Sequence, residues 1–220
     1  MRKFTKPLLI VLAMILVCVT SVFATIAYLT SDTEVVSNTF TVGNVEIDIR
    51  ESNINEDPTD PDDDYIYGGE SQTYEDIVPN QTYAKDPTVI VKAGSEPSYV
   101  RMFVTITKSA AFDEVFADNN LNLADLFEYN ATNWEYKNNV EDTAADTRTY
   151  EFWYKDVTVE GAEYALPALF TQVKVPGVLS NAELATLSGF QINIRAEAIQ
   201  EAGFDNADAA FAALTAEVNA

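Results

Sequence analysis

Within residues 98–107, every second residue from Val100 to Ile106 is apolar, and this alternation is the feature that most limits what the chain can fold into. A two-residue period matches a β-strand with one buried face and does not match the 3.6-residue period of a helix. Further strand patterns lie at residues 149–159, 169–175 and 189–199, and residues 88–92 form a short β-branched run. The chain is therefore predicted to consist mainly of strands. The core-facing positions of the first run are Val100, Met102, Val104 and Ile106.

Helical patterns interrupt these strands only briefly, at residues 112–117 and 123–129 and after Ser180, which has capping-box spacing to Glu183. Because strands do not alternate regularly with crossover helices, the helices are predicted to decorate a β body. The predicted fold class is all-β with helical decorations, in an antiparallel two-sheet sandwich of jelly-roll type. A C-terminal helix is predicted at residues 205–218, where alanines are frequent.

The N-terminus has the pattern of an export signal. Three basic residues and no acid precede the unbroken apolar run of residues 8–19. Thr25 and Ala27 form a small-residue cleavage site before Tyr28, so residues 1–27 are predicted to be a signal peptide. The alternative is an uncleaved anchor, because about 20 apolar residues can span a bilayer. Both interpretations place the body outside the cytoplasm, either secreted into an extracellular matrix or at the cell surface.

Charge and composition exclude several classes of function. The chain has 35 acidic and 13 basic residues and a formal net charge of −22 at pH 7, which disfavours binding to nucleic acid. It contains no histidine, which removes the Ser-His-Asp arrangement and the His-Glu-x-x-His zinc helix. No enzymatic activity and no cofactor are predicted. The one cysteine, Cys18, lies inside the leader, so a mature chain would have no disulfide.

Residues 43–220 are predicted to form a single domain, because the body is too apolar for a disordered acidic protein. Residues 56–64 form an acidic loop whose prolines and like charges oppose helix and strand. Carboxylates are suitable Ca²⁺ ligands, but their spacing differs from that of a helix-loop-helix calcium site, and a solvated loop is the preferred interpretation. The candidate ligands are Asp57, Asp60, Asp62, Asp63 and Asp64.

Motifs distributed over nearly the whole chain resemble the TasA/camelysin family. The motifs are Thr39-Phe40-Thr41-Val42-Gly43-Asn44-Val45, Val78-Pro79-Asn80-Gln81 before Lys85-Asp86-Pro87-Thr88-Val89, Tyr99-Val100-Arg101, and Ala196-Glu197-Ala198-Ile199-Gln200. Val78-Pro79-Asn80-Gln81 departs from the more usual Pro-Gly turn of the family, which affects one loop. The combination is much more specific than any single motif.

The resemblance implies a subunit of biofilm matrix fibres in Gram-positive bacteria, with a leader that a SipW-type signal peptidase removes. It also implies donor-strand complementation, in which residues 28–42 of one subunit complete a sheet of the next by β-augmentation. Self-association into filaments is then the expected interaction, and an accessory anchoring protein is a further partner left open. The apolar donor candidates are Tyr28, Leu29, Val35, Val36, Phe40 and Val42.

Three alternatives stay open at this stage. Residues 28–42 can instead form the first strand of their own sheet, and the chain can be a monomeric secreted or surface-bound binding protein of the same fold. A camelysin-like metalloprotease is a weaker alternative, because zinc would need a site made of carboxylates alone. A cluster of aromatic residues is interpreted as core packing in preference to a carbohydrate platform. Its members are Trp134, Tyr136, Tyr150, Phe152, Trp153 and Tyr154.

Overall fold

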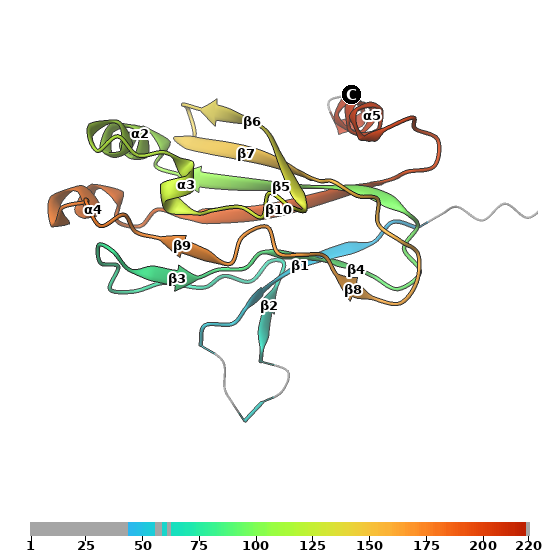
Figure 1. Cartoon of the computed structure of the whole chain (residues 1–220), viewed down its shortest axis with the longest axis horizontal. Helices are drawn as coiled ribbons and strands as arrows, with labels where there is room; N and C mark the ends of the chain where they lie inside the picture. Colours follow the sequence, from blue (N-terminus) through green and yellow to red (C-terminus); the bar gives the residue numbers. More distant parts are fainter. Residues whose placement is uncertain (1–43, 56–58, 61–62, 219–220) are drawn as a thin grey trace, which may run out of the picture. The chain divides into compact units, whose positions relative to one another are not determined.

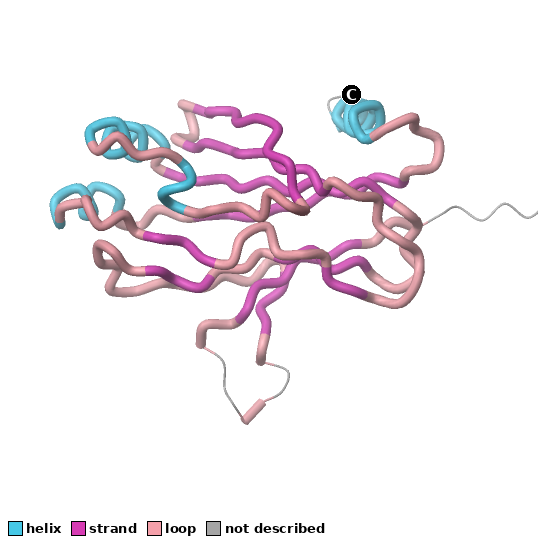
Figure 2. The backbone as a smooth tube through the Cα atoms, in the orientation of Figure 1, coloured by secondary structure: helices cyan, strands magenta, loops and turns pink. Residues whose placement is uncertain are grey.

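The computed structural model describes residues 44–55, 59–60 and 63–218. Every described residue belongs to one compact unit of the chain. In this unit the strands form two layers that pack face to face (Figures 1 and 2). All strand pairs in the described ranges are antiparallel, which confirms the predicted all-β class with few helices.

The first layer is a four-stranded sheet extended by a two-stranded one. Its strands, in spatial order, are β2 (Tyr65–Tyr67), β1 (Ile47–Ser52), β4 (Thr88–Val91) and β8 (Tyr164–Ala165), extended by the pair β3 (Thr82–Ala84) and β9 (Gln172–Lys174). Backbone hydrogen bonds from Leu169 N to Pro87 O and from Lys85 N to Thr171 O join the β4–β8 ladder to the β3–β9 ladder. The two sheets therefore continue one another along the chain.

The second layer is a four-stranded sheet. Its strands, in spatial order, are β10 (Ile192–Gln200), β5 (Ser98–Thr107), β7 (Thr147–Tyr154) and β6 (Trp134–Asp142). The register of β10 on β5 is unbroken from the pair Ile192 and Ile106 to the pair Gln200 and Ser98. Even-numbered residues of β5 face the first layer and are buried, as their apolar alternation predicts.

The hydrophobic core fills the space between the layers. Trp134 and Phe152 have no solvent exposure, and Leu169 joins them from the segment between β8 and β9. Burying side chains of this size contributes about 1.5–3 kcal/mol each. Trp134 also donates its indole N–H to Pro167 O at 2.9 Å, so its polar atom is satisfied inside the core.

Four helices lie at the ends and on the outer face of the described strands (Figure 1). The helices are α2 (Ser109–Asp118), α3 (Leu123–Leu126), α4 (Asn181–Leu187) and α5 (Ala207–Val218). The capping box predicted at Ser180 and Glu183 is present, with both reciprocal hydrogen bonds. No helix in the described ranges combines the length and the apolar character needed to cross a membrane.

Individual strand predictions agree with the structure to different degrees. β5 has the predicted limits, whereas the strand predicted at residues 149–159 ends at Tyr154. It ends early because the chain crosses to the start of β5, where Thr158 N donates to Ser98 O and Ser98 N donates to Thr158 Oγ1. The C-terminal helix begins at Ala207, two residues later than predicted, because Asn206 Oδ1 accepts from Ala209 N as a cap.

Candidate functional site

β10 forms an edge of the second layer, with β5 on one side and no further described strand on the other. Its odd-numbered residues bond to β5, as the hydrogen bonds from Thr107 N to Gln191 O and from Glu201 N to Pro97 O at its two ends indicate. In an antiparallel ladder the alternate residues direct their N–H and C=O groups to the opposite side. The residues whose backbone groups face the open edge are therefore Ile192, Ile194, Ala196 and Ala198.

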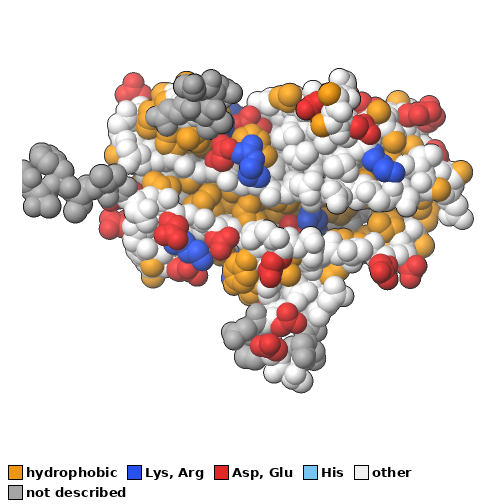
Figure 3. All heavy atoms as spheres, turned by 180° about the vertical axis from the view of Figure 1, so that it is seen from behind, with side chains coloured by type: hydrophobic (Ala, Val, Ile, Leu, Met, Phe, Trp, Pro, Cys, Tyr) orange, Lys and Arg blue, Asp and Glu red, His pale blue; other side chains and the backbone are white. Residues whose placement is uncertain are grey.

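The same four residues direct their side chains toward the core, where they are only partly buried. Ile47 and Ile49 of β1, which contacts β10 from the other layer, are partly buried as well. In the view from behind, hydrophobic side chains form a band along the junction of the two layers (Figure 3). An added strand at this edge would bond to the outward-facing backbone groups, which no described strand pairs with, and would also cover these apolar side chains.

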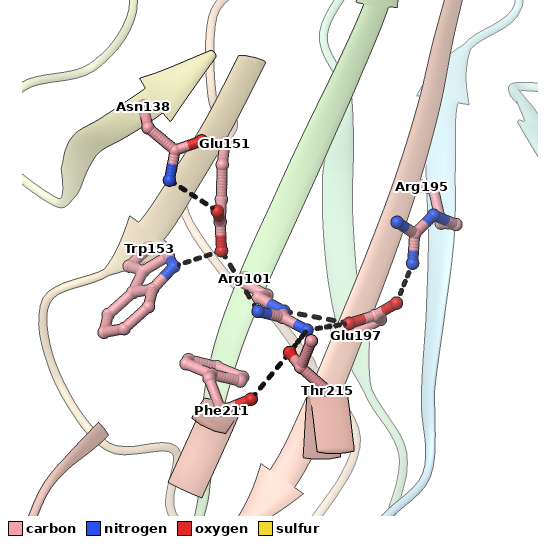
Figure 4. A network of polar contacts seen from close by, with 8 residues as sticks. All are labelled: Arg101, Asn138, Glu151, Trp153, Arg195, Glu197, Phe211 and Thr215. Carbon is pink, nitrogen blue, oxygen red and sulfur yellow. Dashed lines mark hydrogen bonds and ion pairs between the residues drawn. The ribbon is translucent and has the colours of Figure 1, made fainter. Parts of the chain in front are cut away.

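A charged network braces β10 from its outer face (Figure 4). Arg101 on β5 binds Glu197 on β10, with 2.8 Å from Nε and 2.7 Å from Nη2 to Oε2, and binds Glu151 on β7 at 3.1 Å. Trp153 and Asn138 donate to the two oxygens of Glu151 at 2.7 and 2.9 Å. Because each buried charge has partners, the network holds three neighbouring strands in one register.

Helix α5 covers this network. Thr215 lies 3.4 Å from Arg101 Nη2, and the ring of Phe211 lies 4.6 Å from the guanidinium carbon and 4.7 Å from the Trp153 ring. Phe211 is 2% exposed, so the outer face of the sheet is closed over the network. The open side of β10 is thus its edge.

The edge of β3 in the first layer is occupied by a side chain. Tyr74 donates its hydroxyl to Ala84 O at 2.7 Å and packs edge-to-face on Tyr83. Burial, together with the charges of Glu51 and Asp86, raises the pKa of Tyr74 from 10.0 to about 12, so its hydroxyl remains a donor further into the alkaline range than an ordinary tyrosine. Glu51 in turn forms a buried ion pair with Lys85 at 2.7 Å.

The predicted cleavage residues Thr25, Ala27 and Tyr28 lie outside the described residues. So do the donor candidates, which are Tyr28, Leu29, Val35, Val36, Phe40 and Val42. The structure therefore describes the candidate acceptor of a donor strand and leaves the donor itself as a prediction.

The acidic loop is described in part. Asp57 and Asp62 lie outside the described ranges, whereas Asp63 accepts a hydrogen bond from Asn53 Nδ2 at 2.8 Å and donates its backbone N–H to Asp60 O. Asp64 is exposed. Among the residues that the structure describes, no three acidic, cysteine or histidine residues are grouped to hold a metal ion.

Most side chains of the aromatic cluster pack against other side chains, in agreement with the interpretation of the cluster as core packing. Trp134 and Phe152 are fully buried, and Tyr154 packs on Trp134 with ring centroids 5.3 Å apart. Tyr136 is the most exposed member at 38%. The cluster does not form a flat exposed platform for a sugar.

Sequence reasoning missed the Arg101 network, because the partners of Arg101 lie 50 to 114 residues from it in the chain. The available signal was a charged residue at an outward-facing position of a buried central strand, which requires partners on both neighbouring strands. Comparisons with protein-family models, with curated proteins and with solved structures give no match.

Proposed function

We propose that this chain is a secreted structural protein without enzymatic activity, which assembles into extracellular fibres of the biofilm matrix type. The observation that carries the proposal is the edge of β10, where outward-facing backbone groups have no strand partner among the described residues and adjoin partly buried apolar side chains. Edge strands of nine residues are normally shortened, charged or covered in soluble proteins. An edge without such protection favours a partner strand.

The proposed partner strand is the N-terminal segment of a second copy, residues 28–42. This segment follows the export leader and carries apolar residues at both of its ends, with a polar stretch between them. Its backbone would pair with the edge-facing groups of β10, and its apolar side chains would cover Ile192, Ile194 and Ile47. Cleavage after Ala27 by a SipW-type signal peptidase would release the segment for this exchange.

We further propose that the two layers are a jelly-roll sandwich that the donor strand completes. Two four-stranded antiparallel layers with β1 adjacent to β10 support this assignment. Each subunit would give one strand and accept another through different surfaces. Such a head-to-tail contact does not close on itself and produces a filament. An accessory protein would be needed only to anchor the filament.

The test is electron microscopy of residues 28–220, made with a native N-terminus and compared with the same protein lacking residues 28–41. Filaments from the longer protein and monomers from the shorter one are expected. Persistent monomers of the longer protein, at acidic and neutral pH and with added salt, would instead favour a monomeric binding protein. Filaments from the shorter protein would remove the donor role of the segment.

A further inference from the structure

The first described residue, Asn44, lies at the end of the body where β10 ends (Figure 1). Asn44 O accepts from Glu96 N at 2.8 Å, and Glu201 N, just after β10, donates to Pro97 O at 2.8 Å. Glu96 and Pro97 directly precede β5, whose first residue pairs with the last residue of β10. The segment before Asn44 is therefore joined to the body at the C-terminal end of β10.

The first described residues also fix the direction in which that segment is joined to the body. Glu46 N donates to Ser95 Oγ at 3.0 Å, and Glu46 O accepts from Lys92 N at 3.0 Å. Ser95 is 1% exposed, so this contact is anchored in the body. The two bonds extend the line of β1 beyond Val91, the last residue of β4. The backbone followed from β1 toward the N-terminus thus points away from the body.

Residues 36–42 have the sequence pattern of a strand with one apolar face. Three of the four even-numbered residues are apolar, with Asn38 as the exception, whereas the three odd-numbered residues are serine or threonine. The apolar residues are Val36, Phe40 and Val42. The edge of β10 from Ile192 to Ala198 is also seven residues long, and a strand of this length extends about 24 Å. The segment and the edge therefore match in length and in the side on which their apolar residues lie.

The position of Asn44 links the direction of an added strand to the type of assembly. A segment that folds back over β10 of its own subunit would run parallel to β10, because Val42 would stay near Gln200. Two copies that exchange segments reciprocally in a closed dimer would give the same direction. In a head-to-tail filament, the segment leaves one body at its Gln200 end and enters the next at its Ile192 end, so it would run antiparallel to β10.

The described residues favour the antiparallel direction. All strand pairs in the described ranges are antiparallel, and this pairing is slightly more stable per residue than parallel pairing. Folding back would require the chain to reverse immediately before Asn44, where the bonds of Glu46 direct it outward. In a closed dimer the two Gln200 ends would face each other, and the exposed Glu46 and Glu201 of both copies would repel.

We infer that residues 36–42 of one subunit pair antiparallel with residues 192–198 of the next, with Val42 opposite Ile192. This inference rests on the proposed fibre function and deepens it, because it gives the donor strand a direction and each filament a polarity. It also distinguishes donation from a segment that completes the sheet of its own subunit, since the two arrangements require opposite strand directions.

Disulfide cross-linking tests the direction, because residues 28–220 contain no cysteine. The variant Thr41→Cys/Asn193→Cys places two thiols opposite each other on the outward face in the antiparallel arrangement. There the Cα atoms of such a pair are about 4.5 Å apart, which permits a disulfide. The matched variant for the parallel arrangement is Thr41→Cys/Ile199→Cys, and Thr41→Cys alone is the control for chance oxidation. Under reducing conditions all three variants should form filaments as the wild type does, which controls for folding.

After oxidation, Thr41→Cys/Asn193→Cys should form a ladder of covalent oligomers on non-reducing gels, and the other two variants should lack it. A ladder from Thr41→Cys/Ile199→Cys alone, or filaments in which neither pair is linked, would overturn the antiparallel pairing and leave the fibre function standing. A link within one chain of Thr41→Cys/Ile199→Cys, or a linked dimer that grows no further, would contradict both the pairing and the fibre function. Wild-type protein that stays monomeric would also contradict both.

Discussion

The second layer has two edge strands of nine residues each, and they differ in how they avoid further pairing. β6 has a register shift between Tyr136 and Asn138, with Lys137 at the bulge, and it is mostly exposed. β10 has an unbroken register, and its edge-facing residues are isoleucines and alanines whose side chains are partly buried. Bulges and charges on an edge prevent association between sheets. The contrast indicates that β6 is protected against pairing and that β10 is kept available for it.

Proline substitution in β10 should have the largest effect among the tests of this difference between β10 and β6. Ala196→Pro removes an N–H that faces the open edge and leaves the bonds between β10 and β5 in place, which edge strands tolerate. Filament formation by residues 28–220 should be lost in electron micrographs, while the thermal midpoint stays near that of the wild type.

Asn139→Pro is the matched control on β6. The backbone of Val140 bonds to Thr149 of β7, so the backbone N–H of the adjacent residue Asn139 faces the open side of β6. This variant should form filaments as the wild type does. Loss of filaments in both variants, or in Asn139→Pro alone, would show that the two edges do not differ in the proposed way.

Changes in pH and salt concentration should alter the rate of filament growth, with a smaller effect than the proline substitution in β10. Residues 28–220 keep 10 of the 13 basic residues and all 35 acidic ones, which gives 10 − 35 = −25. Subunits with this charge repel one another, and protonation, salt screening or divalent cations reduce that repulsion. Light scattering should therefore show faster filament growth at about pH 4.5 than at about pH 8, and at high salt than at low salt. Rates that are equal across these conditions would mean that charge does not control assembly.

The sequence predicted the strands whose two-residue period is regular, and it missed those set by distant contacts. β5 was predicted to the residue because its even positions from Val100 to Ile106 are all apolar. β6 was missed, because most of its side chains are exposed and a bulge breaks its period. The sequence predicted β10 as a strand. Its position at an edge of the sheet depends on which strands pair with one another, and the residues of β10 alone do not determine that pairing. A pocket lined by residues of α2, α3, β5 and β7 was not predicted for the same reason, because its lining comes from distant parts of the chain.

Removal of Arg101 would test how firmly β10 is held for pairing. Arg101→Ala leaves Glu151 and Glu197 without their shared cation beneath α5, and should lower the free energy of unfolding by about 3 kcal/mol in urea titrations. Arg195→Ala is the control, because Arg195 also binds Glu197 but is 58% exposed, and it should cost less than about 1 kcal/mol. Similar losses in the two variants would mean that the network does not brace the strand.

The smallest expected effect concerns the edge of β3, which Tyr74 already occupies. The pKa of Tyr74 is raised from 10.0 to about 12 in the folded protein, so between these values the unfolded chain loses the proton before the folded one does. This contribution to stability is complete below pH 10 and is lost as the pH rises toward 12. Tyr74→Phe should therefore make the stability decline less steeply over that range in urea titrations at a series of pH values. An unchanged slope would mean that Tyr74 is not held as a protonated donor to Ala84, and β3 would then be a second open edge that competes with β10 for the donor strand.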